Sequence, residues 1–352
     1  MALGQHGAIP CPEHLPLKVL VTGASGFIGT HLVQLLVARG HDVMAASRKP
    51  VDIAGVTWRL SPELSSGSDW SRVLQGAEAV VHLAGRAQTG PESESEEGIC
   101  RRINAEGTAR LAHQAAESGT RRFLFLSSVH VVAEESDQII TDATAPRPVS
   151  AYGRSKLAAE EALRSELGAG ACAWTILRSC AVYGPGNVSN FGRLLKLVAT
   201  GLPLPLASVN NRRSFIYVET LVDLIAASLE APKALGKTYL PSDGDDVSTP
   251  ELIRAIARVN HGDGYRAASV EHQDHAKIRH ASLATCRSPR LFPFSESVLR
   301  GIGSLPGLGP LRKLTSSLYV DSEPLRRDLG WRPPFAMEEG LRRALSSRRN
   351  LD

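Results

Sequence analysis

The fold is decided by residues 17–40, which read LKVLVTGASGFIGTHLVQLLVARG. Residues 17–21 form a short run that is mostly apolar and β-branched, which predicts a buried strand. A turn at Gly23 follows, and apolar residues then recur with helical spacing over 27–39 before the chain reaches Gly40. A strand, a glycine turn and a helix in this order are typical of an α/β fold with a parallel sheet.

The same alternation continues along the first half of the chain. Further strands are predicted at 42–46, 79–83, 123–126 and 173–177, and helices at 103–117, 151–167, 220–229 and 249–259. Parallel βαβ units with right-handed crossovers follow from this order. We therefore expect a Rossmann-type doubly wound parallel sheet.

The second half of the chain is less regular. Pro and Gly are frequent in 183–205 and 288–310, and we expect 291–318 to be rich in loops. The predicted division is an N-terminal extension over 1–16, a Rossmann domain over 17–180 and a smaller C-terminal α/β substrate lobe over 181–352. Some segments of that lobe, about 214–240, are expected to return to the Rossmann domain.

Composition excludes several other classes of protein. A chain of 352 residues with 43% hydrophobic and 22% charged residues is a soluble globular protein rather than a collagen, a coiled coil or a disordered chain. The net charge of +4 is scattered and only 5% of residues are aromatic, which does not indicate nucleic-acid binding. No apolar stretch reaches the ~18 residues of a membrane span.

Cysteine usage and the N-terminus favour a cytoplasmic location. The five cysteines are odd in number and widely spaced, with no CxxC pair or Cys/His cluster, so neither a disulfide framework nor a metal site is predicted. Residues 1–16 lack a basic start followed by an apolar run, so we expect no signal peptide.

The glycine turn predicts a dinucleotide site, because it lies between the first strand and the first helix. Gly23 permits the tight turn, Gly26 lets the backbone approach a pyrophosphate at the helix N-terminus, and Gly29 allows close packing of helix and strand. The alternative is a glycine-rich turn without a ligand. The remaining predicted contacts in this turn are Ser25, Phe27 and Ile28.

The end of the second strand favours NADP(H) over NAD(H). An NAD site usually offers a carboxylate to the ribose 2′-hydroxyl there, whereas this chain reads Ala46-Ser47-Arg48-Lys49. Arg48, helped by Ser47 and Lys49, is expected to pair with a 2′-phosphate. NAD stays possible, because the alternative is that the two cations are exposed surface residues.

Three residues suggest acid–base chemistry. Tyr152 and Lys156 open a helical segment with i, i+4 spacing, which places both on one face. An ammonium near the phenol is expected to lower its pKa toward neutrality, so that Tyr152 gives or takes a proton. Ser128 ends a predicted strand, where ligands of parallel sheets bind, and Ser127 is expected to cap that strand. YxxxK alone arises often by chance; the three in this order are specific.

Together these residues resemble the extended short-chain dehydrogenase/reductase family, in its NAD(P)-dependent epimerase/dehydratase branch that acts on nucleotide sugars. The resemblance covers almost the whole chain. Beyond the residues above, it is carried by His82-Leu83-Ala84-Gly85, Asn104 with Gly107-Thr108, and Arg178 followed by Val182-Tyr183-Gly184-Pro185-Gly186. It implies that Leu83, Ala84, Gly85, Asn104, Tyr152 and Lys156 contact the cofactor.

Later segments narrow the likeness to UDP-glucose 4-epimerase-like proteins and UDP-4-keto-6-deoxy-N-acetylhexosamine 4-reductases of bacterial surface-polysaccharide synthesis. These segments are 190–191, 203–205, 211–218, 242–244 and 329–334. The resemblance implies that Ser128, Tyr152 and Lys156 are catalytic and that the chain forms a homodimer. It also makes Ser128, Asn190 and Arg213 the substrate-binding candidates, although Arg213 could be a surface cation beside Arg212.

Two positions depart from the family pattern. The double serine usually continues into a Gly-Glu ending, whereas residues 131–134 read Val-Val-Ala-Glu. After the third strand the family often has Gly-Asp near the adenine, whereas Leu60-Ser61 stands here. Both changes bear on the identity of the substrate more than on the redox chemistry.

The expected function is therefore NADPH-dependent reduction of a 4-keto group on a nucleotide-linked sugar, with Tyr152 as the proton donor. The alternative is an NAD-dependent 4-epimerase that uses the same residues. A hypothesis from another class is a redox sensor that binds NADP without catalysis. Arg48 favours the reductase.

Overall fold

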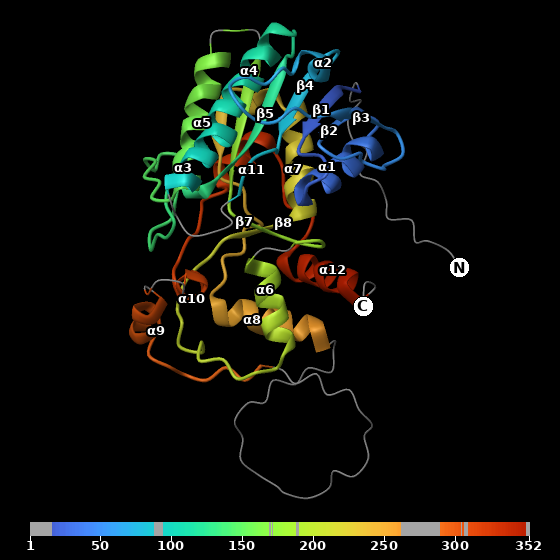
Figure 1. Cartoon of the computed structure of the whole chain (residues 1–352). Helices are drawn as coiled ribbons and strands as arrows, with labels where there is room; N and C mark the ends of the chain where they lie inside the picture. The colour runs from blue at the N-terminus through green and yellow to red at the C-terminus, as the bar shows by residue number, and fades with distance from the viewer. Residues whose placement is uncertain are drawn as a thin grey trace, which may run out of the picture.

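The structure is a computed structural model of the chain. It describes residues 16–87, 94–168, 170, 172–187, 190–261, 289–303, 305 and 309–349, so the predicted extension over 1–16 lies almost entirely outside the described residues. The described residues form two lobes, a sheet with helices on both faces and a smaller lobe below it (Figure 1).

A seven-stranded parallel sheet forms the larger lobe, in the order β3-β2-β1-β4-β5-β6-β9. Its strands are β1 (Lys18–Thr22), β2 (Asp42–Ser47), β3 (Val56–Leu60), β4 (Ala79–His82), β5 (Arg122–Ser128), β6 (Ala173–Ser179) and β9 (Lys237–Tyr239). The strand order reverses between β1 and β4, which is the switch point where ligands of doubly wound folds bind. The predicted fold class is confirmed.

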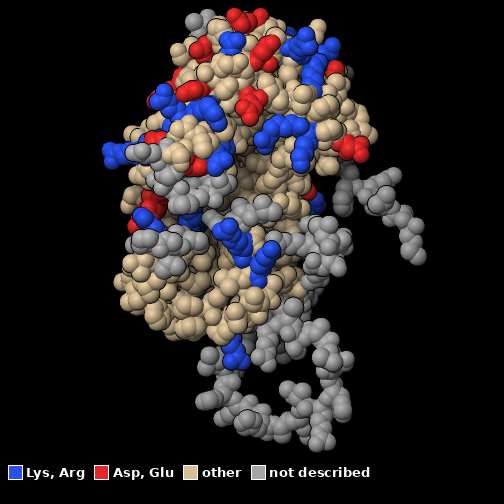
Figure 2. All heavy atoms as spheres, in the orientation of Figure 1, with Lys and Arg blue, Asp and Glu red and all other residues tan. Residues whose placement is uncertain are grey.

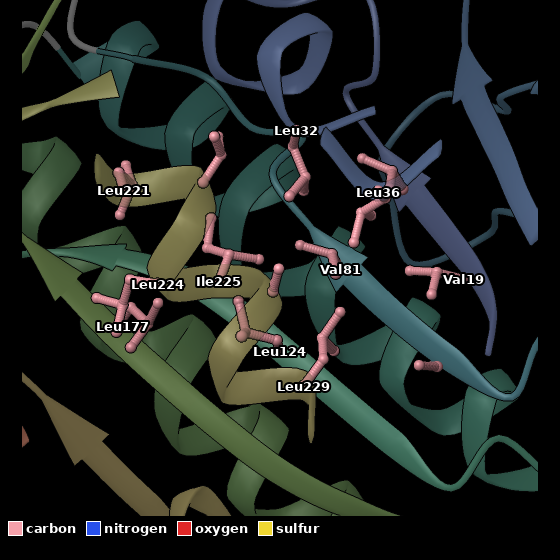
Figure 3. Close-up of a cluster of buried hydrophobic side chains, with 14 of the residues drawn as sticks. Val19, Leu32, Leu36, Val81, Leu124, Leu177, Leu221, Leu224, Ile225 and Leu229 are labelled. Atoms are coloured by element: carbon pink, nitrogen blue, oxygen red, sulfur yellow. The ribbon is translucent and has the colours of Figure 1, made fainter. Parts of the chain in front are cut away.

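Both faces of this sheet are buried under helices. On β1, Val19 and Val21 belong to one buried cluster and Leu20 to the other, because successive side chains of a strand point to opposite faces. Helices α1 (Phe27–Ala38) and α7 (Val218–Glu230) cover the first face, as Figure 3 shows. Helices α2 (Ser71–Leu74), α4 (Gly107–Glu117) and α5 (Ala151–Leu167) cover the second.

The helix that crosses from β4 to β5 is longer than predicted and changes its winding. It runs through α3 (Glu94–Cys100), a π-helical turn η1 (Arg101–Glu106) and α4. Helix α5 has the predicted bounds. Its N-terminus is capped by Ser150, whose Oγ accepts a hydrogen bond of 3.1 Å from the Gly153 N–H.

The smaller lobe has a hydrophobic core of its own. It contains α6 (Asn190–Ala199), α8 (Thr249–His261), α9 (Glu296–Gly303), α10 (Gly309–Thr315) and α12 (Met337–Arg349). The expectation that 291–318 is rich in loops is therefore wrong for α9 and α10. Helix α9 forms because it buries Leu299, and α10 begins at Gly309-Pro310, where proline is tolerated in the first turn.

Segments from the second half of the chain contribute to both lobes. Helix α7 and strand β9 pack onto and extend the large sheet, and α11 (Glu323–Leu329) buries Leu325 against the same core. Strand β8 (Phe215–Tyr217) instead pairs in parallel with β7 (Ala181–Tyr183) between the lobes. The predicted domain boundaries stay a prediction. In the described part of the chain no helix combines the length and the apolar character that crossing a membrane requires.

Candidate active site

The glycine turn between β1 and α1 has a backbone that only glycine fits. Gly23 has a φ of 69°, and a Cβ there would lie 2.8 Å from the Ala84 nitrogen. A Cβ on Gly29 would lie 2.2 Å from the Gly23 oxygen, so α1 packs directly on the turn. The tight turn and the close helix–strand packing expected from the sequence are both present.

The start of α1 opens into the cleft beside this turn. Gly26 is the N-cap residue, and no side chain caps the helix, which leaves its first N–H groups available to an anion. Ser25 also lines the cleft. Phe27 and Ile28 do not line it; they pack against the core of the smaller lobe, so their side chains are structural.

A cleft of about 400 Å³ lies at the carboxyl ends of β1, β2 and β4, at the switch point of the sheet. The lining residues come from the glycine turn, the strand ends, the loop after β3 and the π-helical turn; they are Gly23, Ser25, Gly26, Ala46, Ser47, Arg48, Ser61, Pro62, Glu63, Leu64, Leu83, Ala84, Gly85, Arg86, Arg102 and Ile103. Figure 2 shows Lys and Arg side chains around the hollow above the smaller lobe.

At the end of β2 two of the three predicted phosphate-binding residues, Ser47 and Arg48, line the cleft. Arg48 is exposed and lines the cleft, whereas Lys49 is exposed but does not line it. Ser47 is buried, and its Oγ accepts a hydrogen bond from Trp58 Nε1 at 3.1 Å and donates one to the Lys49 oxygen at 2.5 Å. The Ser47 hydroxyl thus also shapes the turn, and Arg48 is the one of the three that is both exposed and in the cleft; their role in binding a phosphate stays a prediction.

Two exposed, charged residues of the cleft were not predicted from the sequence. Arg102 comes from the π-helical turn and Glu63 from the loop after β3, and both are exposed. Within the described residues, the side chains of Arg48 and Arg102 form no hydrogen bond or ion pair. Arg86, which also lines the cleft, is held by Glu96 in two hydrogen bonds of 2.9 Å. The helical periodicity of the sequence does not predict that Arg102 lies on the side of the helix that faces the cleft.

Asn104 positions the cleft without lining it. Its Oδ1 accepts a hydrogen bond from the Arg86 N–H at 2.8 Å, and its Nδ2 donates to the Arg86 oxygen at 3.0 Å and to Ser155 Oγ at 2.9 Å. With 1% exposure, this side chain ties the loop after β4 to α5. Leu83, Ala84 and Gly85 do line the cleft, as predicted.

Ser128 and Tyr152 are brought together by the turn that follows β5. The Ser128 Oγ accepts a hydrogen bond from the His130 N–H at 3.2 Å, and the Ser128 side chain lies close enough to the Tyr152 phenol to lower its pKa. A Cβ on Gly153 would lie 2.4 Å from the His130 oxygen, so the first turn of α5 rests against this turn. The phenol therefore faces the serine that ends β5.

The ionisation of Tyr152 differs from the expectation. Burial raises the pKa of the Tyr152 phenol to about 12, and the hydrogen bond from Ser128 only partly offsets this effect. The predicted lowering of the Tyr152 pKa is therefore wrong for the chain on its own, because burial outweighs the effects that favour the phenolate. The phenol is protonated at neutral pH.

Lys156 is buried on the adjacent turn of α5. Its Nζ donates to the Leu126 oxygen at 2.9 Å and lies 4.3 Å from the centre of the Phe125 ring. Burial lowers the pKa of Lys156 to about 8, against the opposing charge of Glu160. A carbonyl oxygen and an aromatic face thus hold the ammonium in place.

A histidine and a glutamate, neither of them predicted, complete the wall beside Tyr152. The His130 ring packs edge-on against the Tyr152 ring, with centroids 6.1 Å apart, and its Nδ1 lies 3.4 Å from Glu134 Oε2. The other Glu134 oxygen accepts a hydrogen bond from Ser150, the cap of α5. Burial lowers the pKa of His130. Glu134 lies in the stretch where the chain departs from the family pattern, and His130 directly precedes that stretch.

Ser127 has a structural role, as expected. Its Oγ donates to the buried Glu160 at 2.6 Å, and Glu160 also accepts a hydrogen bond of 2.8 Å from Arg178 Nη2. This buried pair ties α5 to β5 and β6.

The two substrate candidates other than Ser128 lie in or beside the smaller lobe. Arg213 is half-buried, and its Nη1 donates a hydrogen bond to the Ser316 oxygen at 3.0 Å. Burial lowers the Arg213 pKa, and the negative charge of Glu134 opposes this effect. Arg212, by contrast, is exposed, so Arg213 is not a surface cation like its neighbour. Asn190 is the first residue of α6, and its side chain lies outside the described residues.

The sheet order, the glycine turn at the switch point and the Ser128–Tyr152–Lys156 arrangement define an extended dehydrogenase/reductase fold. Residues 19–240 match the model of the NAD dependent epimerase/dehydratase family. The chain belongs to this family. The described residues contain no cluster of side chains suited to a metal ion.

Known proteins support the same assignment. The chain is 32% identical over 335 residues to a UDP-glucose 4-epimerase of Vibrio cholerae, covering 93% of this chain and 94% of that protein. It is 32% identical over 248 residues to a ceramide reductase of Caulobacter vibrioides, covering 68% and 70%. Among solved structures it resembles MoeE5 in complex with UDP-glucose and NAD, with a TM-score of 0.72, 25% identity and coverage of 95% of this chain and 100% of that one.

Proposed function

We propose that the protein is an oxidoreductase acting at C4 of a nucleotide-linked sugar. The reaction is the NADPH-dependent reduction of a UDP-4-keto-6-deoxy-N-acetylhexosamine in surface-polysaccharide synthesis. The observation that carries this proposal is the buried, protonated phenol of Tyr152 beside Ser128, one helical turn from Lys156, whose Nζ lies close to Gly85 of the cleft. A reductase needs an acid at this point, and a phenol with a pKa of about 12 holds its proton at neutral pH.

The residues present fit a dinucleotide. Gly23, Gly26 and Gly85 line the cleft without a side chain to occupy it, and the uncapped start of α1 suits a pyrophosphate. The glycine turn would hold the pyrophosphate, Arg48 the ribose 2′-phosphate, and Tyr152 with Lys156 the nicotinamide end. A bound nicotinamide coenzyme supplies the hydride that C4 receives.

The residues of the chain handle the proton. The Ser128 hydroxyl donates a hydrogen bond to the C4 carbonyl oxygen and orients it beside the phenol. Tyr152 gives its proton to this oxygen as the carbon gains the hydride, so the ketone becomes a secondary alcohol. The phenolate that remains is stabilised by the Lys156 ammonium and then regains a proton from water.

A 4-epimerase is the second candidate, favoured by the similarity to the Vibrio cholerae UDP-glucose 4-epimerase and to a structure with UDP-glucose and NAD. It would use the same three residues. In that reaction Tyr152 must first accept a proton from the C4 hydroxyl, which a pKa of about 12 disfavours in the chain alone. A positive charge beside the phenol would lower this pKa. Glu63 in the cleft also suits a ribose hydroxyl better than a phosphate.

The cofactor separates the two candidates. The purified protein is denatured, any released dinucleotide is identified by mass, and the cofactor-free protein is titrated with NADPH and NADH. An empty site with preference for NADPH supports the reductase, and UDP-4-keto-6-deoxy sugars are then tested for NADPH oxidation. Stoichiometric NAD⁺ makes the epimerase the leading candidate, and UDP-glucose is then assayed for its C4 epimer.

A non-catalytic redox sensor is distinguished by Tyr152→Phe. This variant loses the proton donor but keeps the cleft. If it retained biological function, both enzyme candidates would be wrong. The homodimer implied by the family resemblance is tested separately by light scattering of the purified protein.

A further inference from the structure

Two arginines that have no side-chain partner among the described residues line the same cleft from different elements. Arg48 follows β2, and Arg102 lies in the π-helical turn η1; both are exposed. Within the described residues neither side chain forms a hydrogen bond or ion pair. The neighbouring arginines differ, because Arg86 is held by Glu96 and Arg101 Nε lies 3.3 Å from Glu106 Oε1.

The π-helical turn accounts for the placement of Arg102. π-turns inside α-helices are rare and frequently mark functional sites. Here the turn lets Asn104 point inward, where it bonds Arg86 and Ser155, while Arg102 two residues earlier lines the cleft. The same turn brings Arg101 next to Glu106, five residues on. Of these two adjacent arginines, Arg102 therefore lines the cleft and Arg101 does not.

Bound NAD would offer the Arg102 guanidinium no anion of its own. The pyrophosphate common to both coenzymes is served by the backbone N–H groups of the glycine turn and of the α1 N-terminus. The additional anion of NADP is the 2′-phosphate, which suits guanidinium groups. We propose that Arg102 determines the specificity for NADP over NAD, because it binds the 2′-phosphate of NADP together with Arg48. This inference rests on the proposed use of NADPH.

Glu63 is the opposing charge in this cleft. It is exposed, lines the same cleft and is the single carboxylate among the lining residues. Because Glu96 neutralises Arg86, the cleft presents two unpaired cations against one carboxylate. The balance favours a phosphate, and removing the Glu63 charge should favour it further.

The test is coenzyme binding, measured by fluorescence titration of the cofactor-free full chain with NADPH and with NADH. Arg102→Ala is expected to weaken NADPH binding by about 10- to 100-fold, the value of one charge-assisted hydrogen bond, and to leave NADH binding nearly unchanged. Arg101→Ala is the matched control and should leave both unchanged. Glu63→Gln should tighten NADPH binding. Since Arg102 is exposed, the variants should fold, which circular dichroism checks.

Each other outcome has a distinct meaning. An equal loss of NADPH and NADH binding in Arg102→Ala would place Arg102 on the adenine or the pyrophosphate and overturn the inference. Loss of the NADPH preference in Arg48→Ala but not in Arg102→Ala would also overturn it, while leaving the proposed cofactor intact. A wild-type protein that prefers NADH would instead contradict the proposed cofactor itself.

Discussion

The backbone of Gly153 lies against the carbonyl oxygen of His130, so closely that a Cβ at residue 153 would be 2.4 Å from this oxygen. Gly153 follows Tyr152 on α5, and the His130 N–H donates to Ser128. Because Gly153 has no side chain, the first turn of α5, which carries Tyr152, packs directly on the turn after β5, which contains Ser128. The distance between the Tyr152 and Ser128 hydroxyl groups depends on this contact.

We predict that Gly153→Ala uncouples the proton donor from the serine. The new methyl group would meet the His130 carbonyl and force α5 outward, at a cost of about 1–3 kcal/mol in stability. A displacement of about 1 Å at a reacting group lowers kcat by about 100-fold. Gly98→Ala in α3 is the control, because nothing lies within 4 Å of its missing Cβ. Steady-state kinetics and thermal melting of both variants test this prediction. An unchanged kcat in Gly153→Ala would contradict it.

Removing the proton donor should affect catalysis without affecting coenzyme binding. Tyr152→Phe is expected to lower kcat by about 100- to 10,000-fold, the usual value of general acid catalysis. Ser128→Ala should lower it less, since the serine only orients the carbonyl. Turnover of the keto sugar is measured beside the Kd for NADPH. Ser127→Ala is the contrasting variant: it should reduce stability, because Ser127 bonds the buried Glu160, and leave the chemical step intact.

The pH profile should report Lys156 rather than Tyr152. Burial lowers the Lys156 pKa to about 8, so the ammonium is present below that pH and is lost above it. We expect kcat/KM for reduction to fall as the pH rises through about 8. The phenol keeps its proton over this range, since the Tyr152 pKa is about 12. Lys156→Arg keeps its charge and should lack this alkaline limb; a limb that persisted there would have another origin.

Much of this site follows from local patterns in the sequence. The glycine turn is recognisable because Gly23 and Gly29 occupy positions that no other residue fits. Helix α5 has the predicted bounds because Ser150 caps it and its apolar spacing is regular. Strand β9 was not predicted, since three residues at a sheet edge carry too little periodicity, and it exists through its pairing with β6.

Other features depend on contacts that no local pattern contains. The cleft position of Arg102 results from a π-helical turn, and Glu63 reaches the cleft through a loop. The Tyr152 pKa moved opposite to the expectation, because spacing reveals that a lysine is on the same face but not that burial outweighs its charge. Ser47 was assigned to the phosphate, whereas Trp58 and the Lys49 carbonyl engage its hydroxyl.

The buried pair of Glu160 and Arg178 should be essential for stability. Glu160 is 0% exposed and accepts hydrogen bonds from Ser127 and from Arg178 at 2.8 Å. Glu160→Ala would leave a buried arginine without its main partner, which costs about 3–5 kcal/mol. Glu161→Ala, the next residue and exposed, should cost less than about 0.5 kcal/mol. Urea unfolding of both variants checks this, and equal midpoints would contradict it.

A buried carboxyl between the two lobes should make stability depend on pH. Asp243 accepts hydrogen bonds of 3.0 Å from the Tyr183 hydroxyl and from the Tyr217 N–H, which joins β7 and β8 to the segment after β9. Burial raises its pKa from 3.8 to about 7. The folded state therefore binds this proton more tightly than the unfolded chain does.

The sign of the pH dependence follows from this raised pKa. The contribution of Asp243 is most favourable below pH 3.8, declines as the pH rises and reaches its minimum above about 7. The free energy of unfolding should thus fall between about pH 4 and pH 8 by an amount that Asp243→Asn removes. Asp42→Asn, which changes an exposed carboxyl at the start of β2, serves as the control. Urea melts of the three proteins across this pH range would contradict the assignment if the wild-type and Asp243→Asn curves ran parallel.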